Sequence, residues 1–180
     1  MTQSSDQVLT TTRKWVESFV IGLNLCPFAK KELVQDRIRF IVSEASTEID
    51  LLISLKKEIE LLEGDTSIET TLLIHPNVLN DFGDYNQFLS HADELLVHLN
   101  FEGVFQIASF HPNYQFAGTT PRDAENYTNR SPFPILHLLR EESLESAIEQ
   151  YDDVDQIPSR NIAKMNELGL EGVKELLARK

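Results

Sequence analysis

The sequence has a single cysteine, Cys26, so no internal disulfide can form. It has no apolar run close to the roughly 20 residues that span a membrane, and residues 1–8 lack the basic and apolar pattern of a secretory signal. These absences exclude a disulfide scaffold and a membrane-spanning helix. They predict a cytoplasmic protein that does not act in the membrane.

Basic clusters and the common cofactor motifs are also missing. The sequence has 16 Lys and Arg residues and 29 Asp and Glu residues, which gives a net charge of -13. Because this charge repels phosphate backbones, no nucleic-acid partner is expected. There is no Gly-rich phosphate loop, dinucleotide fingerprint, His-Glu-x-x-His helix or Cys-x-x-Cys pair. The motifs therefore imply no cofactor, although a divalent metal stays open.

The composition is that of a folded globular protein, with 41% hydrophobic and 25% charged residues over 180 positions. We expect a single domain over residues 1–180, with a flexible N-terminus at residues 1–9. The β-branched and aromatic runs predict three strands, which are Ile38–Val42, Thr70–Ile74 and Val104–Phe110. Amphipathic segments at residues 10–25, 47–63 and 85–99 predict helices before and between them.

Strands that alternate with helices of this length predict right-handed crossovers and hence parallel strands. The fold expected is α/β, a small three-stranded parallel sheet with helices packed on it. The chain from Pro132 onward predicts a C-terminal helical layer: a short helix through Arg140, then Ser143–Tyr151, Pro158–Leu168 and Glu171–Ala178. A ferredoxin-like α+β fold is the alternative, if a strand around Val154–Ile157 joins the sheet antiparallel.

Two of the predicted strands end in the same dipeptide, as His75-Pro76 and His111-Pro112. Ligands of open α/β sheets bind outside the carboxyl ends of the strands. If the two strands are neighbours, their backbones lie roughly 4.8 Å apart and both imidazoles can reach one ligand or metal. The alternative is that each His-Pro only ends a strand.

The long aperiodic segment from Asn113 to Asn129 is a second candidate region, because such loops are uncommon unless functional or disordered. Tyr114, Phe116 and Tyr127 could hold it down as a lid, a pocket wall or a plain surface loop. At its end, Ser131-Pro132 predicts a helix start, where Asn129 and Arg130 could bind a carboxylate or phosphate. A structural salt bridge of Arg130 is the alternative.

The predicted helix through Arg140 places His137, Arg140 and Glu141 on one face at i, i+3 and i+4. This face suits a general acid or base beside an anion holder, and His137 with Glu141 also has the spacing of two helical metal ligands. A solvated face with an ion pair has the same pattern.

Cys26 is flanked by apolar residues and is expected to be a buried, inert thiol, with a nucleophile or a metal ligand as alternatives. Arg160 lies in the first turn of the helix that begins near Pro158. Its side chain could point toward the same pocket or lie on the surface.

Four segments together resemble a bacterial family catalogued as domain of unknown function 1415. They are Leu25-Cys26-Pro27-Phe28, residues 110–119 (FHPNYQFAGT), residues 129–141 with NRSP and HLLRE, and Ile157-Pro158-Ser159-Arg160-Asn161. The resemblance extends from about Thr10 to Gly169. It implies a single-domain cytosolic bacterial protein and assigns no catalytic residue.

Three functions are compatible with these residues. The leading hypothesis is a small metal-independent enzyme that acts on a phosphate- or carboxylate-bearing molecule. Its catalytic candidates are His111, His137 and Glu141, and its substrate-binding candidates are Arg130, Arg140, Asn129, Tyr114 and Arg160. The second hypothesis is a metal site, catalytic or structural, drawn from His75, His111, His137, Glu141 and Cys26. The third is a non-catalytic binding module that uses the loop from Asn113 to Tyr127.

Overall fold

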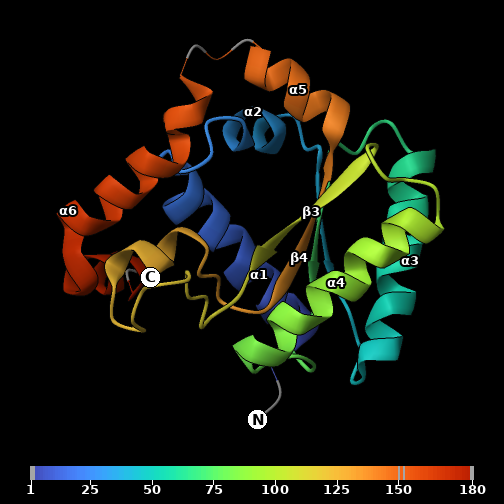
Figure 1. Cartoon of the computed structure of the whole chain (residues 1–180), viewed down its shortest axis with the longest axis horizontal. Coiled ribbons are helices and arrows are strands. Elements are labelled where there is room, and N and C mark those ends of the chain that lie inside the picture. The colour runs from blue at the N-terminus through green and yellow to red at the C-terminus, as the bar shows by residue number, and fades with distance from the viewer. Residues whose placement is uncertain (1–2, 150, 152, 179–180) are drawn as a thin grey trace.

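The computed structural model describes residues 3–149, 151 and 153–178, and its centre is a four-stranded mixed sheet (Figure 1). The strand order is β1 (Ile38–Val42), β2 (Thr70–Ile74), β4 (Ile135–Arg140) and β3 (Phe105–Phe110). β1 pairs parallel with β2, whereas β4 is antiparallel to both of its neighbours, so β1, β2 and β3 run in the same direction. The predicted mixture of helices and sheet is confirmed, and the sheet of three parallel strands is corrected to four strands of mixed direction.

The fourth strand is the segment predicted as a short helix through Arg140. It lies between β2 and β3, where both faces are covered, and its side chains other than His137 and Arg140 are therefore apolar on both sides. Ile135 faces one layer of helices while Leu136 and Leu138 face the other. A continuous apolar run of this kind has no strict alternation, so its apolar residues also fit a helical stripe.

Helices cover both faces of the sheet (Figure 1). On one face, α3 (Glu48–Gly64) and α4 (Phe82–His98) pack against a core that includes Leu73, Leu136 and Leu138. On the other face, a second core joins β-strand residues to side chains of α1 (Ser5–Trp15), the π-helical turn η1 (Val16–Ile21) and α6 (Ile157–Ala178). The remaining helices are short: α2 (Ala29–Val34), η2 (Ala124–Thr128), α5 (Glu141–Glu149) and η3 (Val154–Gln156).

The first helix begins earlier than predicted, because Ser4 forms a capping box with Gln7. Ser5–Leu9, part of the segment expected to be flexible, form the first turns of α1. None of the described helices is long and apolar enough to cross a membrane.

The C-terminal helices largely follow the prediction. The two helices expected at 158–168 and 171–178 form α6, which kinks at Gly169, where φ is 66°. The helix expected at 143–151 is α5, and position 150 of that expectation lies outside the described residues. The strand expected at Val154–Ile157 in the ferredoxin-like alternative is wrong, because Val154–Gln156 form a 3-10 turn.

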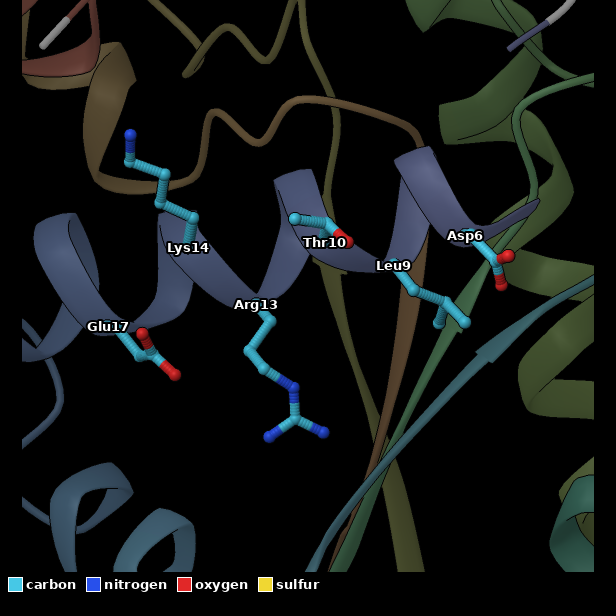
Figure 2. A pocket seen from close by; sticks show the side chains of 6 residues that line it. All are labelled: Asp6, Leu9, Thr10, Arg13, Lys14 and Glu17. Carbon is cyan, nitrogen blue, oxygen red and sulfur yellow. The ribbon is translucent and has the colours of Figure 1, made fainter. Parts of the chain in front are cut away.

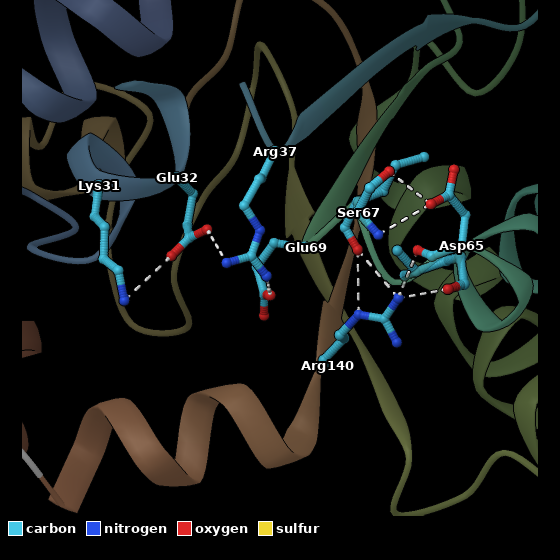
Figure 3. A network of polar contacts seen from close by, with 9 residues as sticks. Lys31, Glu32, Arg37, Asp65, Ser67, Glu69 and Arg140 are labelled. Carbon is cyan, nitrogen blue, oxygen red and sulfur yellow. Dashed lines mark hydrogen bonds and ion pairs between the residues drawn. The ribbon is translucent and has the colours of Figure 1, made fainter. Parts of the chain in front are cut away.

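A polar network joins α2 to the beginnings of β1 and β2 (Figure 3). Arg37, just before β1, pairs with Glu32 of α2 at 3.4 Å and with Glu69, just before β2. Both carboxylates are mostly buried, so the guanidinium neutralises charge that the protein interior would otherwise disfavour. This network stabilises the end of the sheet at which β1 and β2 begin, opposite to the carboxyl ends of β2 and β3.

Candidate functional site

The two His-Pro histidines lie at the carboxyl ends of β2 and β3, as predicted, but their strands are not neighbours. β4 separates them, and its first residue, Ile135, is opposite Ile74 and Phe110 at once. The strands that carry His75 and His111 are therefore two strand spacings apart, roughly 9.6 Å. His75 and His111 are each 0% exposed.

Tyr85 of α4 lies between the two imidazoles. Its ring centroid is 5.8 Å from that of His75 and 5.0 Å from that of His111. Its hydroxyl donates a hydrogen bond to the Ile135 carbonyl at 2.7 Å and accepts one from the Phe110 amide at 3.1 Å. The phenol therefore occupies the position at which the sequence predicted a shared ligand.

Both histidines are neutral and bound to backbone groups. His75 Nδ1 lies 3.1 Å from the Val78 carbonyl, which can only accept, so Nδ1 carries the proton. His111 Nε2 donates in the same way to the Leu79 carbonyl at 3.1 Å, and its Nδ1 accepts from the Asn113 amide at 3.0 Å. Burial lowers the pKa of both, that of His75 to about 4. Neither ring has a nitrogen exposed for acid–base chemistry.

The long loop after β3 is ordered by a buried asparagine that sequence reasoning did not single out. Asn126 is 0% exposed, and its side-chain oxygen accepts from the Phe116 amide and the Thr119 hydroxyl, both at 2.9 Å. Its side-chain amide donates to the Thr120 carbonyl at 2.8 Å. Asn129, a predicted ligand residue, ties the loop to β3 by donating to the Ser109 carbonyl at 3.1 Å.

Arg130 serves the same loop. Its Nε donates to the Tyr114 carbonyl at 3.0 Å and its Nη2 to the Pro121 carbonyl at 2.9 Å, while its guanidinium lies 4.5 Å from the Tyr127 ring centroid. The helix predicted to start at Ser131 is absent, because residues 131–134 lead directly into β4. The guanidinium therefore contacts the loop backbone, where the sequence suggested a salt bridge or a bound anion.

His137, Arg140 and Glu141 were expected on one helical face, and that arrangement is wrong. His137 and Arg140 belong to β4, where residues three apart point to opposite faces, and Glu141 begins α5. His137 packs near Phe110, with ring centroids 6.0 Å apart, on the face covered by α1. It lies about 10 Å along the strand direction from the edge that carries His75.

His137, like His75, has one ring nitrogen without a hydrogen-bonding partner among the described residues. Thr70 donates its hydroxyl proton to the Leu138 carbonyl, so His137 Nε2, 2.7 Å from the same hydroxyl oxygen, must be the donor in that contact. Its Nδ1 has no hydrogen-bonding partner among the residues that the structure describes, and the side chain is half-buried. Desolvation lowers its pKa to about 4, so the ring is neutral at pH 7.

Arg140 points to the opposite face and caps the end of α3 (Figure 3). Its guanidinium donates to the backbone carbonyls of Leu62, Asp65 and Ile68, the last two at 3.1 and 3.0 Å through Nη2. These include carbonyls that the final turn of a helix leaves without partners. The side chain predicted to bind a substrate anion therefore donates hydrogen bonds to carbonyls at the end of α3 and in the turn before β2.

We expect Arg140→Met to lower the free energy of unfolding by about 2 kcal/mol, because charged hydrogen bonds to several carbonyls are lost. The measurement is equilibrium unfolding in urea. Arg122→Met in the exposed part of the loop is the matched control and is expected to change stability by less than about 0.5 kcal/mol. Equal stability of the two variants would contradict the capping role.

The segments that carry Cys26 and Arg160 contact one another at another place in the fold. Asn161 donates to the Leu25 carbonyl at 2.8 Å, and Arg160 Nη2 donates to the Tyr151 hydroxyl at 3.1 Å. The Tyr151 ring contacts that of Phe28, with centroids 5.8 Å apart. Burial raises the pKa of the Cys26 thiol, which favours the protonated, unreactive form.

The residues proposed as metal ligands do not converge. Within the described part of the chain, no group of three or more His, Cys, Asp or Glu side chains is placed to hold a metal ion. A hollow beside α1 is lined by Asp6, Leu9, Thr10, Arg13, Lys14 and Glu17 (Figure 2), none of which was predicted as a site residue. Arg13 there extends over the Phe40 ring, 4.4 Å from its centroid.

Sequence reasoning missed three residues that contact the candidate residues or their loop, Tyr85, Asn126 and Thr70. Tyr85 lies at the start of a segment that the sequence predicted only as an amphipathic helix, and the aperiodic loop gave no signal for Asn126. A polar Thr70 at the start of a buried strand could have been noticed as a partner for a histidine.

The comparisons with known proteins agree with the motifs quoted above. A family model described as "Protein of unknown function (DUF1415)" matches residues 7–175. Curated proteins and solved structures gave no match. The matched segment includes nearly all of the chain, from α1 to α6, and the chain therefore belongs to the DUF1415 family.

Proposed function

We propose that this chain is a non-catalytic binding protein that recognises a partner through three half-buried aromatic rings. Phe82 at the start of α4 lies 5.1 Å from Tyr114 between ring centroids, and Tyr114 lies 5.0 Å from Phe116. We call Phe82, Tyr114 and Phe116 the aromatic patch. This continuous, partly exposed set of rings is the observation that carries the proposal, because aromatic residues are enriched in protein interfaces.

The rigidity of the loop beneath the patch supports binding. Asn126 and Arg130 hold the segment that carries Tyr114 and Phe116 by hydrogen bonds to its backbone. A loop that is already ordered loses little conformational entropy when a partner binds. Arg130, which the sequence suggested for substrate binding, therefore has a consistent use in shaping this surface.

The hydrogen bonding and burial of His75 and His111 also favour a binding role over catalysis at this end of the sheet. A general base must reach the proton that it removes, directly or through one water. His111 has both nitrogens bonded to backbone, and the free nitrogen of His75 is buried. The patch, by contrast, has apolar surface available to a partner.

We test the patch with a purified partner, first captured by photo-crosslinking from position 116 and then identified and produced alone. The double variant Tyr114→Ser with Phe116→Ser is expected to bind that partner at least tenfold more weakly, because two aromatic contacts are lost. Val34→Ser, at an exposed apolar position on α2, is the matched control and should bind as the unchanged protein does. Equal affinity of the double variant would reject the proposal.

A second candidate function is a small enzyme in which His137 is the acid or base. The free Nδ1 of a neutral imidazole, with its tautomer set by Thr70, is the specific observation in its favour. Arg130 and Arg140 give the expected anion little support, since both guanidinium groups bond to carbonyls. In a thermal-shift screen of small phosphates and carboxylates, a ligand that stabilises the unchanged protein but not His137→Gln would favour this candidate.

The remaining expectations accompany the proposal. The excess of acidic residues supports a partner other than nucleic acid or an anionic membrane. A cytoplasmic location and a bacterial origin remain predictions from the sequence.

A further inference from the structure

His75 and His111 hold the same turn, the segment between β2 and α4. Each imidazole donates to a carbonyl of this turn, one to Val78 and the other to Leu79. Leu79 has a φ of 58°, a left-handed conformation that costs a residue other than glycine about 1–2 kcal/mol. The turn therefore depends on the two donors to keep its shape, and it leads directly into Phe82.

His111 also holds the loop on the other side of the aromatic patch. Its Nδ1 accepts from the Asn113 amide, next to Tyr114 in the chain. Only a neutral imidazole can donate through one nitrogen and accept through the other. A protonated ring has two donors, so Nδ1–H would face the Asn113 N–H and this hydrogen bond would be lost.

We propose that His75 and His111 form an acid-sensitive latch, which holds the aromatic patch together when both rings are neutral and releases its two sides when they are protonated. The β2–α4 turn carries Phe82, and the loop after β3 carries Tyr114 and Phe116. The consequence for partner binding rests on the function proposed above. The opening of the latch does not.

The groups around the two rings favour opening on protonation. Asp81, the N-cap of α4, lies close enough to stabilise a charge on His111, but its side chain also accepts from the amides of Gly83 and Asp84. His75 opposes that charge, because two like charges in one buried cluster repel. The Tyr85 ring packs against both imidazoles, and burial raises the pKa of its phenol, so it contributes no compensating charge near neutral pH.

The free nitrogen of His75 adds to the effect. Nε2 is buried without a hydrogen-bonding partner among the described residues, so a proton added there has no acceptor. Both rings reach water as cations only if the turn and the loop separate. Burial lowers the pKa of each ring, as this coupling requires.

The test is amide hydrogen exchange on the full chain at pH 7.5 and pH 5.0, corrected for the intrinsic rates. We expect the protection of Asn113, relative to Leu138 in the central strand, to fall at least tenfold at the lower pH. His111→Asn is the matched variant, because its side-chain oxygen can accept from the Asn113 amide near the place of Nδ1 and does not titrate. The pH response of Asn113 should largely disappear in this variant.

A second measurement tests the acid-sensitive latch if His111→Asn does not fold. The ring nitrogen chemical shifts of His111 in the unchanged protein report its tautomer and its protonation, and the midpoint should coincide with the loss of Asn113 protection. Protonation of His111 without that loss would overturn the proposal, as would an equal loss in His111→Asn. The double variant of Tyr114 and Phe116 separates the two proposals, since failure of partner binding does not affect this exchange experiment.

Discussion

Replacing Tyr85 by phenylalanine is expected to lower the free energy of unfolding by about 2–4 kcal/mol, although only one oxygen atom is removed. The hydroxyl is the partner of the Ile135 carbonyl and of the Phe110 amide, and Tyr85 is 0% exposed. Each buried backbone group left without a partner costs about 1–3 kcal/mol. Equilibrium unfolding in urea measures the change as a shift of the midpoint at unchanged slope.

Tyr151→Phe is the matched control for this substitution. The Tyr151 hydroxyl accepts from Arg160 in an exposed contact, so its removal should change stability by less than about 0.5 kcal/mol. If Tyr85→Phe were as stable as this control, the phenol would not be the bridge between β3, β4 and α4 that the hydrogen bonds indicate.

Acidification from pH 7 to pH 5 is expected to remove about 4 kcal/mol of stability through His75 and His137 together, roughly half through each, and the lowered pKa of His111 adds to this loss. Desolvation lowers the folded-state pKa of His75 and of His137 to about 4, whereas the unfolded value is about 6.5. The unfolded chain therefore binds protons first as the pH falls. The stability is fully present above pH 6.5 and is lost between about pH 6.5 and 4.

Single substitutions divide this pH dependence between the two histidines. His137→Gln keeps a donor for Thr70 without titrating in this range, and it should retain about 2 kcal/mol of the stability otherwise lost at pH 5. His91→Gln is the control, because that side chain is 57% exposed, and it should lose as much stability as the unchanged protein. An unfolding free energy that is constant between pH 7 and pH 5 would contradict the desolvated, neutral state of these rings.

The strands that the sequence predicted correctly are those with a clear local pattern. Ile38–Val42 and Thr70–Ile74 have the predicted boundaries, and Phe105–Phe110 begins one residue late. Each follows a helix or turn signal and is rich in β-branched or aromatic residues. Their common direction also followed from the helical crossovers.

The fourth strand could not be recognised in the same way. Ile135–Arg140 is a central strand whose neighbours come from distant parts of the chain, so its pairing is a tertiary property. Its short apolar run after Pro134 fits a buried strand as well as a helix. This one misassignment changed the interpretation of the site, since it put His137 and Arg140 on the same face and allowed the strands of His75 and His111 to be neighbours.

The positions of the candidate residues were therefore predicted better than their contacts. His75 and His111 do lie at strand ends, and Asn129 and Arg130 do lie beside the long loop. What these side chains bind depends on backbone carbonyls from other elements, which a single sequence does not place. Tyr85, which bonds to the Ile135 carbonyl, and Asn126, which bonds to the loop backbone, were missed for the same reason.

Binding of one purified partner to three forms of the protein decides between a binding surface and a catalytic histidine. The forms are the unchanged chain, His137→Gln, and the double variant Tyr114→Ser with Phe116→Ser, all at pH 7.5. A binding role predicts that His137→Gln binds within about threefold of the unchanged chain, because His137 lies away from the aromatic patch, while the double variant loses at least tenfold in affinity. Full affinity in the double variant, together with a loss confined to a folded His137→Gln, would contradict it and make His137 the functional residue.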